Sequence, residues 1–346
     1  MNRKDYGYQF ARFVLTWIIF FHHVLTTGRD QGMSLPFLIN KAFSRPSGGL
    51  GQMAVAMFFL LSGALMWRNH QELEIGRFYR KRIFGILIPI WICSIPLIIV
   101  DYLVNPSLVL SAYARHTILF NFLGLDLYLG VLTGIYPYHV AGEWFTSVIL
   151  TMYILYPLLK KLFSEKKIRV ISTVVITAVF VVNFKIKLFT MGNGWYSFSV
   201  GLFYFWCGML YEKYRDKLIE KKPVIISSIV FVAVYLFYNM LPFVRLSSPA
   251  VSLTGFIVLN WFGNRIGNSI NGTAVEKIID FTCKNSYMIY LTHHYIIITL
   301  MKGFLLAGLD LFWLFVVSVI IIVCIYSVLC RTANDFVLKK IGSRKK

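Results

Sequence analysis

The stretch FARFVLTWIIFFHHVLTT, residues 10–27, decides how this chain folds. Arg12 is its only charged residue, and the neighbouring histidines His22 and His23 lie close to its other end. About 17–25 mostly apolar residues in a helix are enough to cross a bilayer. Polar and charged groups inside a membrane are costly and usually serve a function. The stretch therefore predicts a membrane-spanning helix that carries part of a functional site.

The same criterion predicts ten membrane-spanning helices along the chain. A further apolar stretch, 117–134, is interrupted by Asn121, Asp126 and three glycines, so we expect a re-entrant or interfacial element there. The predicted fold class is an all-α, polytopic transmembrane bundle. The predicted spans are 10–27, 50–67, 83–104, 144–163, 168–188, 196–212, 223–240, 248–264, 286–304 and 310–330.

The composition supports this fold class. The 346 residues are 58% hydrophobic and 14% charged, whereas a soluble domain carries about 25% charged residues. This deficit of charge excludes a disordered chain, a coiled coil and an ordinary cytosolic enzyme. We interpret the net charge of +20 as a sign of membrane topology and of contact with anionic membrane lipids, not of nucleic acid binding.

The distribution of lysine and arginine predicts the orientation. With the N-terminus in the cytoplasm, 26 of the 35 basic residues fall in cytoplasmic segments and 8 fall outside. Cytoplasmic loops of membrane proteins are enriched in these residues. We therefore expect a multi-pass protein of the cell membrane with both termini inside. The first span is followed by no small-residue cleavage site, so we expect it to remain as a helix.

Signatures of several other chemistries are absent from the sequence. The five cysteines form no C-x-x-C pair and have no metal-ligand spacing, so we expect neither a disulfide framework nor a metal site. No G-x-S-x-G or H-E-x-x-H motif is present.

The spacing of Arg12 and His23 places them on one face of the first span. At about 100° and 1.5 Å per residue, eleven residues return to within roughly 20° of the same direction and rise about 16 Å. His22 points about 80° away from Arg12. A cytosolic anionic donor bound by Arg12 and a reaction near mid-membrane at His23 would fit this face. The alternative is a snorkelling arginine and a packed, hydrogen-bonded histidine.

Five segments together resemble the acyltransferase-3 family of integral membrane acyltransferases. They occur in the family's order across nearly the whole chain, and each is a weak signal by itself. The segments are Arg12 with His23; Met57-Phe58-Phe59-Leu60-Leu61-Ser62-Gly63; Arg77-Phe78-Tyr79-Arg80-Lys81-Arg82 with Ile88-Pro89; Gly142-Glu143-Trp144-Phe145 with Tyr153 and Tyr156-Pro157; and Ser286-Tyr287-Met288-Ile289-Tyr290-Leu291-Thr292-His293.

The chain departs from the family pattern at two positions. Gly85 stands where many members have a second arginine, and Ile149 stands where many have a carboxylate after the tryptophan. Glu143, directly before Trp144, is the nearest acid. We therefore carry over the roles of Arg12 and His23 more firmly than the role of a carboxylate.

The resemblance implies one integral membrane acyltransferase domain over residues 1–346. It implies transfer of an acyl group, most often acetyl from acetyl-CoA, to a hydroxyl of a bacterial surface polysaccharide (exopolysaccharide or capsule) or a lipid-linked glycan. We assign catalytic roles to His23, Arg12 and Glu143, and expect His23 to act as a general base or to carry the acyl group. A non-enzymatic polysaccharide exporter or flippase is the alternative, and it would not need Arg12 and His23 on one face.

The remaining candidates divide between donor and acceptor. Arginine binds phosphates in bidentate fashion. The basic segment therefore suits coenzyme A, although the positive-inside rule alone would also explain it; it consists of Arg68, Arg77, Arg80, Lys81 and Arg82. Aromatic and polar side chains around 105–143 suit a sugar, and they equally suit an interfacial aromatic belt. The donor-binding candidates are Arg77, Arg80, Arg82 and Ser62, and the acceptor-side candidates are His139, Trp144 and His293.

Overall fold

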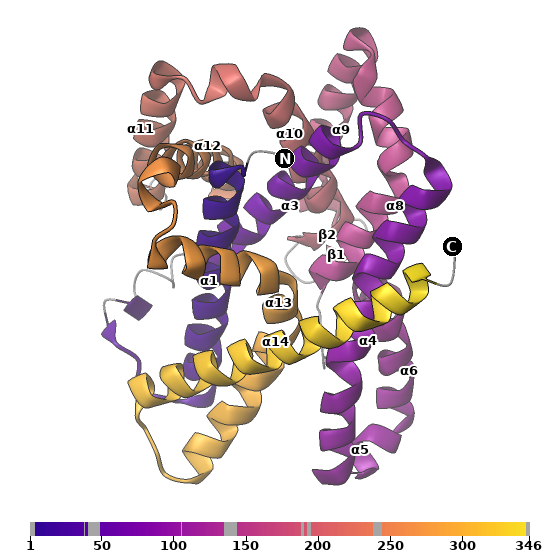
Figure 1. Cartoon of the computed structure of the whole chain (residues 1–346), viewed down its shortest axis with the longest axis vertical. Helices are drawn as coiled ribbons and strands as arrows, with labels where there is room; N and C mark the ends of the chain where they lie inside the picture. The colour runs from indigo at the N-terminus through magenta and orange to yellow at the C-terminus, as the bar shows by residue number, and fades with distance from the viewer. Residues whose placement is uncertain are drawn as a thin grey trace. The chain divides into compact units, whose positions relative to one another are not determined.

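The computed structural model describes residues 4–37, 39–40, 49–104, 106–134, 144–187, 190–191, 195–237 and 244–343 (Figure 1). Nearly all of them are helical, and the two-residue strands β1 (Thr190–Met191) and β2 (Tyr196–Ser197) pair antiparallel. The predicted all-α class is therefore confirmed. The helices divide into two compact units that are interleaved along the chain. Helices α10, α13 and α14 contribute residues to both units.

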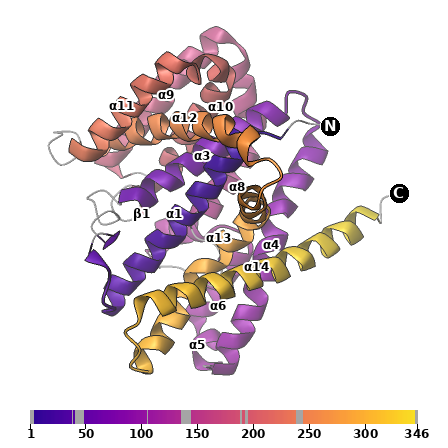
Figure 2. The same cartoon turned by 60° about the vertical axis from the view of Figure 1, so that its left-hand side comes forward.

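The first unit is built around α1. It combines residues Met1–His70, Tyr204–Ser286 and Leu300–Val316. In this unit α1 packs against α3 and α12, and α12 also packs against α11, as Figures 1 and 2 show. Its helices are α1 (Tyr6–Gln31), α3 (Gly49–Asn69), most of α10 (Phe198–Leu218), α11 (Lys221–Phe237), α12 (Val244–Ile270), both ends of α13 (Ala274–Leu306) and the start of α14 (Phe312–Ser343).

The second unit combines residues Gln71–Phe203, Tyr287–Thr299 and Val317–Lys346. Here α8 packs against α4, α7 and α9, and α4 also contacts α5 and α6. Its helices are α4 (Ile75–Val104), α5 (Pro106–Leu110), α6 (Ala112–Phe122), α7 (Asp126–Thr133), α8 (Trp144–Ser164), α9 (Lys166–Ile186), the middle of α13 and most of α14.

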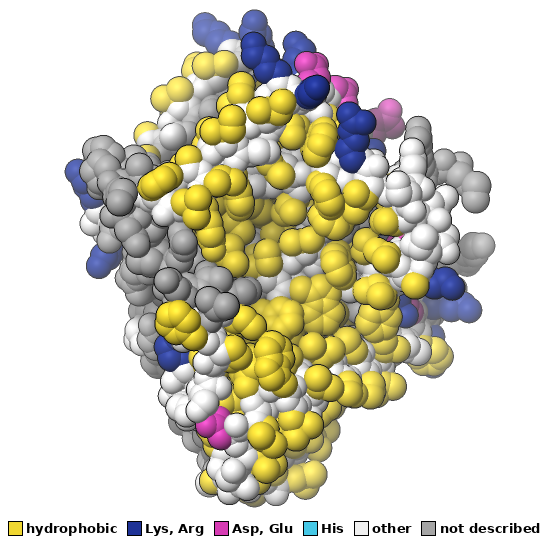
Figure 3. Space-filling view, turned by 90° about the vertical axis from the view of Figure 1, so that its left-hand side faces the viewer, with side chains coloured by type: hydrophobic (Ala, Val, Ile, Leu, Met, Phe, Trp, Pro, Cys, Tyr) yellow, Lys and Arg dark blue, Asp and Glu magenta, His cyan; other side chains and the backbone are white. Residues whose placement is uncertain are grey.

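Seven helices are long and apolar enough to cross a membrane within the described residues: α1, α3, α4, α8, α9, α13 and α14, the last counted to Ile341. The predicted spans 196–212, 223–240 and 248–264 overlap α10, α11 and α12, which are helical but do not join that group. The chain is thus a polytopic helical protein, while the count of ten spans is not confirmed. Hydrophobic side chains cover much of the face shown in Figure 3, as expected of helices that meet lipid.

The apolar stretch 117–134 is broken, as its glycines predicted. Helix α6 ends at Phe122, and Gly124 takes a left-handed φ of 65° before α7 begins at Asp126. Neither α6, with 11 residues, nor α7, with 8, could cross a bilayer. We use the name α6–α7 hairpin for residues 112–133.

Glycine explains one of the sequence motifs in structural terms. A methyl group at Gly63 would lie 1.9 Å from the carbonyl oxygen of Phe205, and one at Gly208 would lie 2.0 Å from that of Leu60. Helices α3 and α10 therefore approach each other backbone to backbone, which only small residues allow in a membrane bundle. Gly63 of this motif thus belongs to a helix crossing.

Candidate functional site

Helix α1 is continuous from Tyr6 to Gln31, which the shared face of Arg12 and His23 requires. Asp5 caps its start by accepting a hydrogen bond from the backbone N–H of Tyr8. Gly32 ends it in the left-handed conformation, with φ of 84°, a geometry that favours glycine.

One side of α1 is occupied by α12. A methyl group at Gly7 would lie 2.7 Å from the carbonyl oxygen of Asn260, and one at Gly263 would lie 2.6 Å from Cβ of Phe10. Viewed along α1, Arg12 lies about 140° from Gly7 and His23 about 160°. The face with Arg12 and His23 is therefore turned away from the contact with α12.

The side chains on this face are half-buried at Arg12 and His23 and buried at Thr16 between them. The Thr16 hydroxyl donates to the Arg12 carbonyl oxygen at 2.8 Å. Among the described residues, the Arg12 guanidinium has neither an ion pair nor a hydrogen bond, although it lies in an apolar helix. A guanidinium in this setting can bind an anionic ligand without first breaking an ion pair.

His22 and His23 have different surroundings. A methyl group at Gly51 of α3 would lie 2.4 Å from Cγ of His22, so this imidazole packs directly on the α3 backbone. The two imidazole rings meet edge to face, with centroids 5.4 Å apart. His22 is thus a packing residue between α1 and α3, while His23 lies on the face with Arg12.

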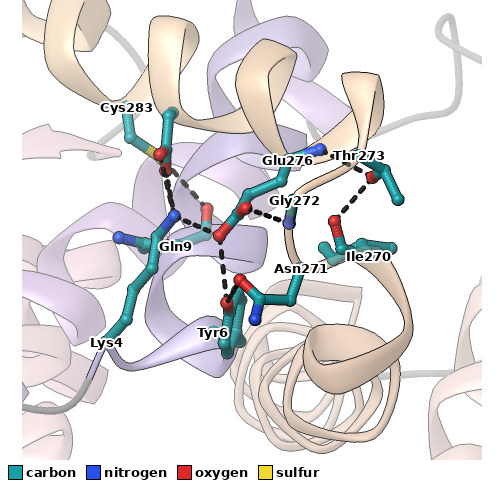
Figure 4. A network of polar contacts seen from close by, with 10 residues as sticks. Lys4, Tyr6, Gln9, Ile270, Asn271, Gly272, Thr273, Glu276 and Cys283 are labelled. Carbon is teal, nitrogen blue, oxygen red and sulfur yellow. Dashed lines mark hydrogen bonds and ion pairs between the residues drawn. The ribbon is translucent and has the colours of Figure 1, made fainter.

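The first turn of α1 is fixed to α13 by a polar network (Figure 4). The Lys4 ammonium donates to Glu276 at 2.6 Å and to Asp280 at 2.8 Å, and the Tyr6 hydroxyl donates to Glu276 at 2.9 Å. Burial alone would lower the pKa of Lys4, but its hydrogen bonds to Asp280 and Glu276 outweigh this and raise the pKa. Deeper along the helix, the Cys283 thiol donates to the Gln9 carbonyl oxygen at 3.2 Å.

A second cluster, the Asp5 cluster, joins α1 to α3 and α10. It consists of Asp5, Tyr8, Arg68, Glu212 and Arg215. Arg215 donates to both Asp5 carboxylate oxygens, at 2.5 and 2.9 Å, and Arg68 donates to one of them. The Tyr8 hydroxyl donates to Glu212, and the Arg215 guanidinium lies 4.3 Å from the Tyr8 ring centroid.

Asp5 is strongly stabilised as a carboxylate in this cluster. Burial would raise its pKa, but the hydrogen bonds and charge of Arg215 outweigh burial and lower the pKa to about 2. Sequence reasoning missed this cluster. The one available signal was an aspartate directly before the first apolar helix, a typical N-cap position.

The predicted basic segment is divided by the structure. Arg68 belongs to the Asp5 cluster, whereas the other basic residues lie in the first two turns of α4. Arg77 and Arg80 are exposed, and Arg77 pairs with Glu74 at 3.4 Å. Arg82 is half-buried and lies 5.3 Å from the Tyr153 ring centroid on α8. Ser62, the fourth donor-binding candidate, is half-buried on α3.

The acceptor-side candidates Trp144 and His293 lie close to a shared aromatic contact. Phe145, next to Trp144 at the start of α8, has its ring centroid 5.4 Å from that of Tyr290 on α13. The Thr146 hydroxyl donates to the Tyr290 hydroxyl at 3.4 Å. His293 is 1% exposed, and its Nδ1 lies 2.8 Å from the Tyr290 carbonyl oxygen. His139 and Glu143 lie outside the described residues.

No group of three or more histidine, cysteine, aspartate or glutamate side chains that could hold a metal ion occurs in the described part of the chain. The two units provide two sets of candidate residues. One is Arg12 and His23 on α1, and the other is the α8–α13 contact with Trp144 and His293.

Comparison with known protein families identifies the chain. The family model for the acyltransferase-3 family, described as an acyltransferase domain, matches residues 5–331. Comparisons with curated proteins and with solved structures gave no match. The matched range contains all five segments on which the resemblance rested. The chain belongs to the acyltransferase-3 family and is a membrane acyltransferase.

Proposed function

We propose that this membrane acyltransferase moves an acetyl group from cytosolic acetyl-CoA to a hydroxyl of a surface polysaccharide or a lipid-linked glycan at the cell membrane. One observation carries the proposal. The Arg12 guanidinium has no ion pair or hydrogen bond among the described residues and shares a face of α1 with His23. A cation in an apolar helix that has no ion pair among the described residues is suited to an anionic substrate.

The donor's phosphate groups enter from the cytosolic side in this proposal. Arg77 and Arg80 on the exposed start of α4 provide the first contacts, because guanidinium groups bind phosphate in bidentate fashion. Arg82, which stacks on Tyr153, and Ser62 complete the donor-binding set. Arg12 on α1 is the proposed donor contact within the membrane.

The reaction at His23 has a defined balance. The acceptor hydroxyl oxygen attacks the thioester carbonyl carbon, the carbon–sulfur bond breaks, and the hydroxyl proton passes through the imidazole to the leaving thiolate. Alternatively, His23 first takes the acetyl group from sulfur and then gives it to the hydroxyl. In both routes, a neutral imidazole must start the reaction, since a protonated ring can neither accept a proton nor attack.

The acceptor is proposed to bind at the start of α8. Trp144, half-buried and 5.2 Å from the Tyr196 ring centroid, offers an aromatic face to a sugar. His293 lies next to Tyr290, one turn further along α13, and can orient the acceptor hydroxyl. His139 and Glu143, which directly precede α8 in sequence, are assigned to the same acceptor side.

The proposal is tested with radiolabelled acetyl-CoA added to membranes that contain the chain. We expect label to enter glycan or lipid-linked glycan with the wild-type chain. We expect label transfer to fall by about a hundred- to ten-thousandfold with His23→Ala, the cost of losing a general base. Equal transfer by both chains at matched membrane levels would contradict the role of His23. Transfer by neither chain would contradict the proposed donor or acceptor.

A further inference from the structure

Asp126 is a buried carboxylate that the proposed reaction does not use. Among the lysine, arginine, aspartate and glutamate side chains described, only Asp126 and Arg169 are buried, at 1% and 7% exposure. Arg169 has an evident task, because it donates to the carbonyl oxygen of Phe163 at 2.8 Å at the end of α8. A buried carboxylate in a membrane protein is costly, so Asp126 requires its own explanation.

The contacts of Asp126 join the α6–α7 hairpin to α4. Asp126 is the first residue of α7, where a negative charge is favourable. Its carboxylate accepts a hydrogen bond from the Asn121 amide at 3.1 Å, and the Asn121 carbonyl accepts one from the Ser94 hydroxyl at 3.2 Å. Asn121 and Ser94 are 2% and 0% exposed.

The other side of α7 is fixed to the start of α8. The backbone N–H of Leu127 donates to the Ser147 hydroxyl at 3.1 Å, and the hydroxyls of Tyr128 and Thr151 lie 2.6 Å apart. Ser147 directly follows Thr146, whose hydroxyl donates to Tyr290. A continuous set of contacts therefore leads from Asp126 through α7 and the first turn of α8 to α13.

We propose that Asp126 is a positioning residue for the acceptor site. Its hydrogen bond with Asn121 sets where α7 lies, and α7 in turn orients the first turn of α8, residues 144–147, against Tyr290 and His293. Asp126 touches neither substrate in this proposal. The inference rests on the proposed function, because it assigns the start of α8 to the acceptor.

The test compares two substitutions at one position. Asp126→Ala removes the accepting oxygen, and we expect the KM for the acceptor to rise by about ten- to a hundredfold, as small displacements near a reacting group can cost. The KM for acetyl-CoA should stay within about twofold. Asp126→Asn keeps an oxygen that accepts from Asn121, so its acceptor KM should stay within about threefold of the wild-type value.

Each other outcome has a definite meaning. A rise in the acceptor KM of Asp126→Asn as large as that of Asp126→Ala would show that the charge or a proton of Asp126 is needed. This result would overturn the positioning role. An equal rise of both KM values in Asp126→Ala would indicate general damage and also overturns it. Ser94→Ala, which removes only the outer hydrogen bond, serves as the matched control with a smaller rise in acceptor KM than Asp126→Ala.

A second readout does not depend on catalysis. Trp144→Cys, labelled with a membrane-impermeant maleimide, reports the exposure of the start of α8 against the background of the native cysteines. We expect Asp126→Ala to change the labelling rate and Asp126→Asn to leave it unchanged. If the wild-type chain transfers no acetyl group, the proposed function fails. Labelling then decides alone: an unchanged rate in Asp126→Ala overturns the positioning role.

Discussion

The start of α1 and the turn that carries Arg12 both hold charged side chains, but within the described part of the chain only the charges at the start are paired. At the first turn, Lys4 and Asp5 are bound by partners on α3, α10 and α13. Two turns further, the Arg12 guanidinium has no ion pair or hydrogen bond among the described residues. The comparison teaches that a charged residue where a helix enters the membrane does not by itself indicate a binding site. A charge that is paired with another protein group holds the helix in place, whereas a charge without such a partner can bind a ligand.

The prediction with the largest consequence is the membrane topology, because it decides which end of α1 faces the cytosolic donor. A reporter fused after Lys346 should read cytoplasmic, and one inserted near Asn105 should read external, because 26 of 35 basic residues then lie inside. Opposite signals at both positions would place Arg12 near the external face. Donor entry past Arg12 would then be wrong.

Arg12→Ala removes the charge of α1 that has no ion pair among the described residues. We expect acetyl transfer to fall by about a hundred- to a thousandfold, the cost of removing one donor to a developing or bound charge. Arg12→Lys should recover only part of the rate, because an ammonium does not reproduce the guanidinium fork. Both variants should reach the membrane at normal levels. Full activity of Arg12→Ala would mean that Arg12 only packs.

The start of α4 offers a test with a built-in control. The double variant Arg77→Ala/Arg80→Ala should raise the KM for acetyl-CoA about tenfold, or about 1.4 kcal/mol, with kcat little changed. Arg68→Ala is the control, since Arg68 pairs with Asp5 and should affect stability without changing that KM. The assignment fails if Arg68→Ala raises the KM and the double variant leaves it unaltered.

Asp5→Asn removes the carboxylate that pairs with Arg68 and Arg215 at the start of α1. Because Arg215 would lose its carboxylate partner and Arg68 would keep only Glu212, we expect the chain in detergent to lose about 2 kcal/mol of stability at pH 7. The pKa of Asp5 is lowered from 3.8 to about 2, so its stabilisation is complete above pH 3.8 and disappears as the pH falls through 2.

Thermal unfolding of the wild type and of Asp5→Asn at several pH values measures the stabilisation that the Asp5 carboxylate provides. The two midpoints should differ at pH 7 and converge as the pH approaches 2. Acetyl transfer per folded molecule should remain near the wild-type value. Identical midpoints at pH 7 would show that the Asp5 cluster does not stabilise the folded chain.

Much of the fold could be predicted from the sequence, because apolar runs of membrane length leave few alternatives to a helix. The ends of helices could not. Helix α13 begins at Ala274, well before the predicted span at 286. The charged residues Glu276 and Asp280 favoured a loop in the sequence, but in the structure they lie on the helix and pair with Lys4. In the same way, α4 begins at Ile75, before the predicted span at 83, and so includes Arg77, Arg80 and Arg82.

The candidate site was predictable only where it follows from one helix. Arg12 and His23 share a face because helical geometry is fixed. The Asp5 cluster and the Asp126–Asn121 contact depend on tertiary pairing between segments far apart in sequence or across a break in a helix. Such pairings leave no periodic signal in the sequence.

The most direct measurement of the central claim compares His22→Ala with His23→Ala. The two residues are adjacent in sequence, and only rotation and packing distinguish them: His22 packs on Gly51, and His23 shares the face of Arg12. The rate of acetyl transfer to glycan is measured for each variant at matched membrane levels. The account predicts that His23→Ala loses transfer by at least about a hundredfold, while His22→Ala keeps most of it. Near-normal transfer by His23→Ala together with loss in His22→Ala would contradict the account.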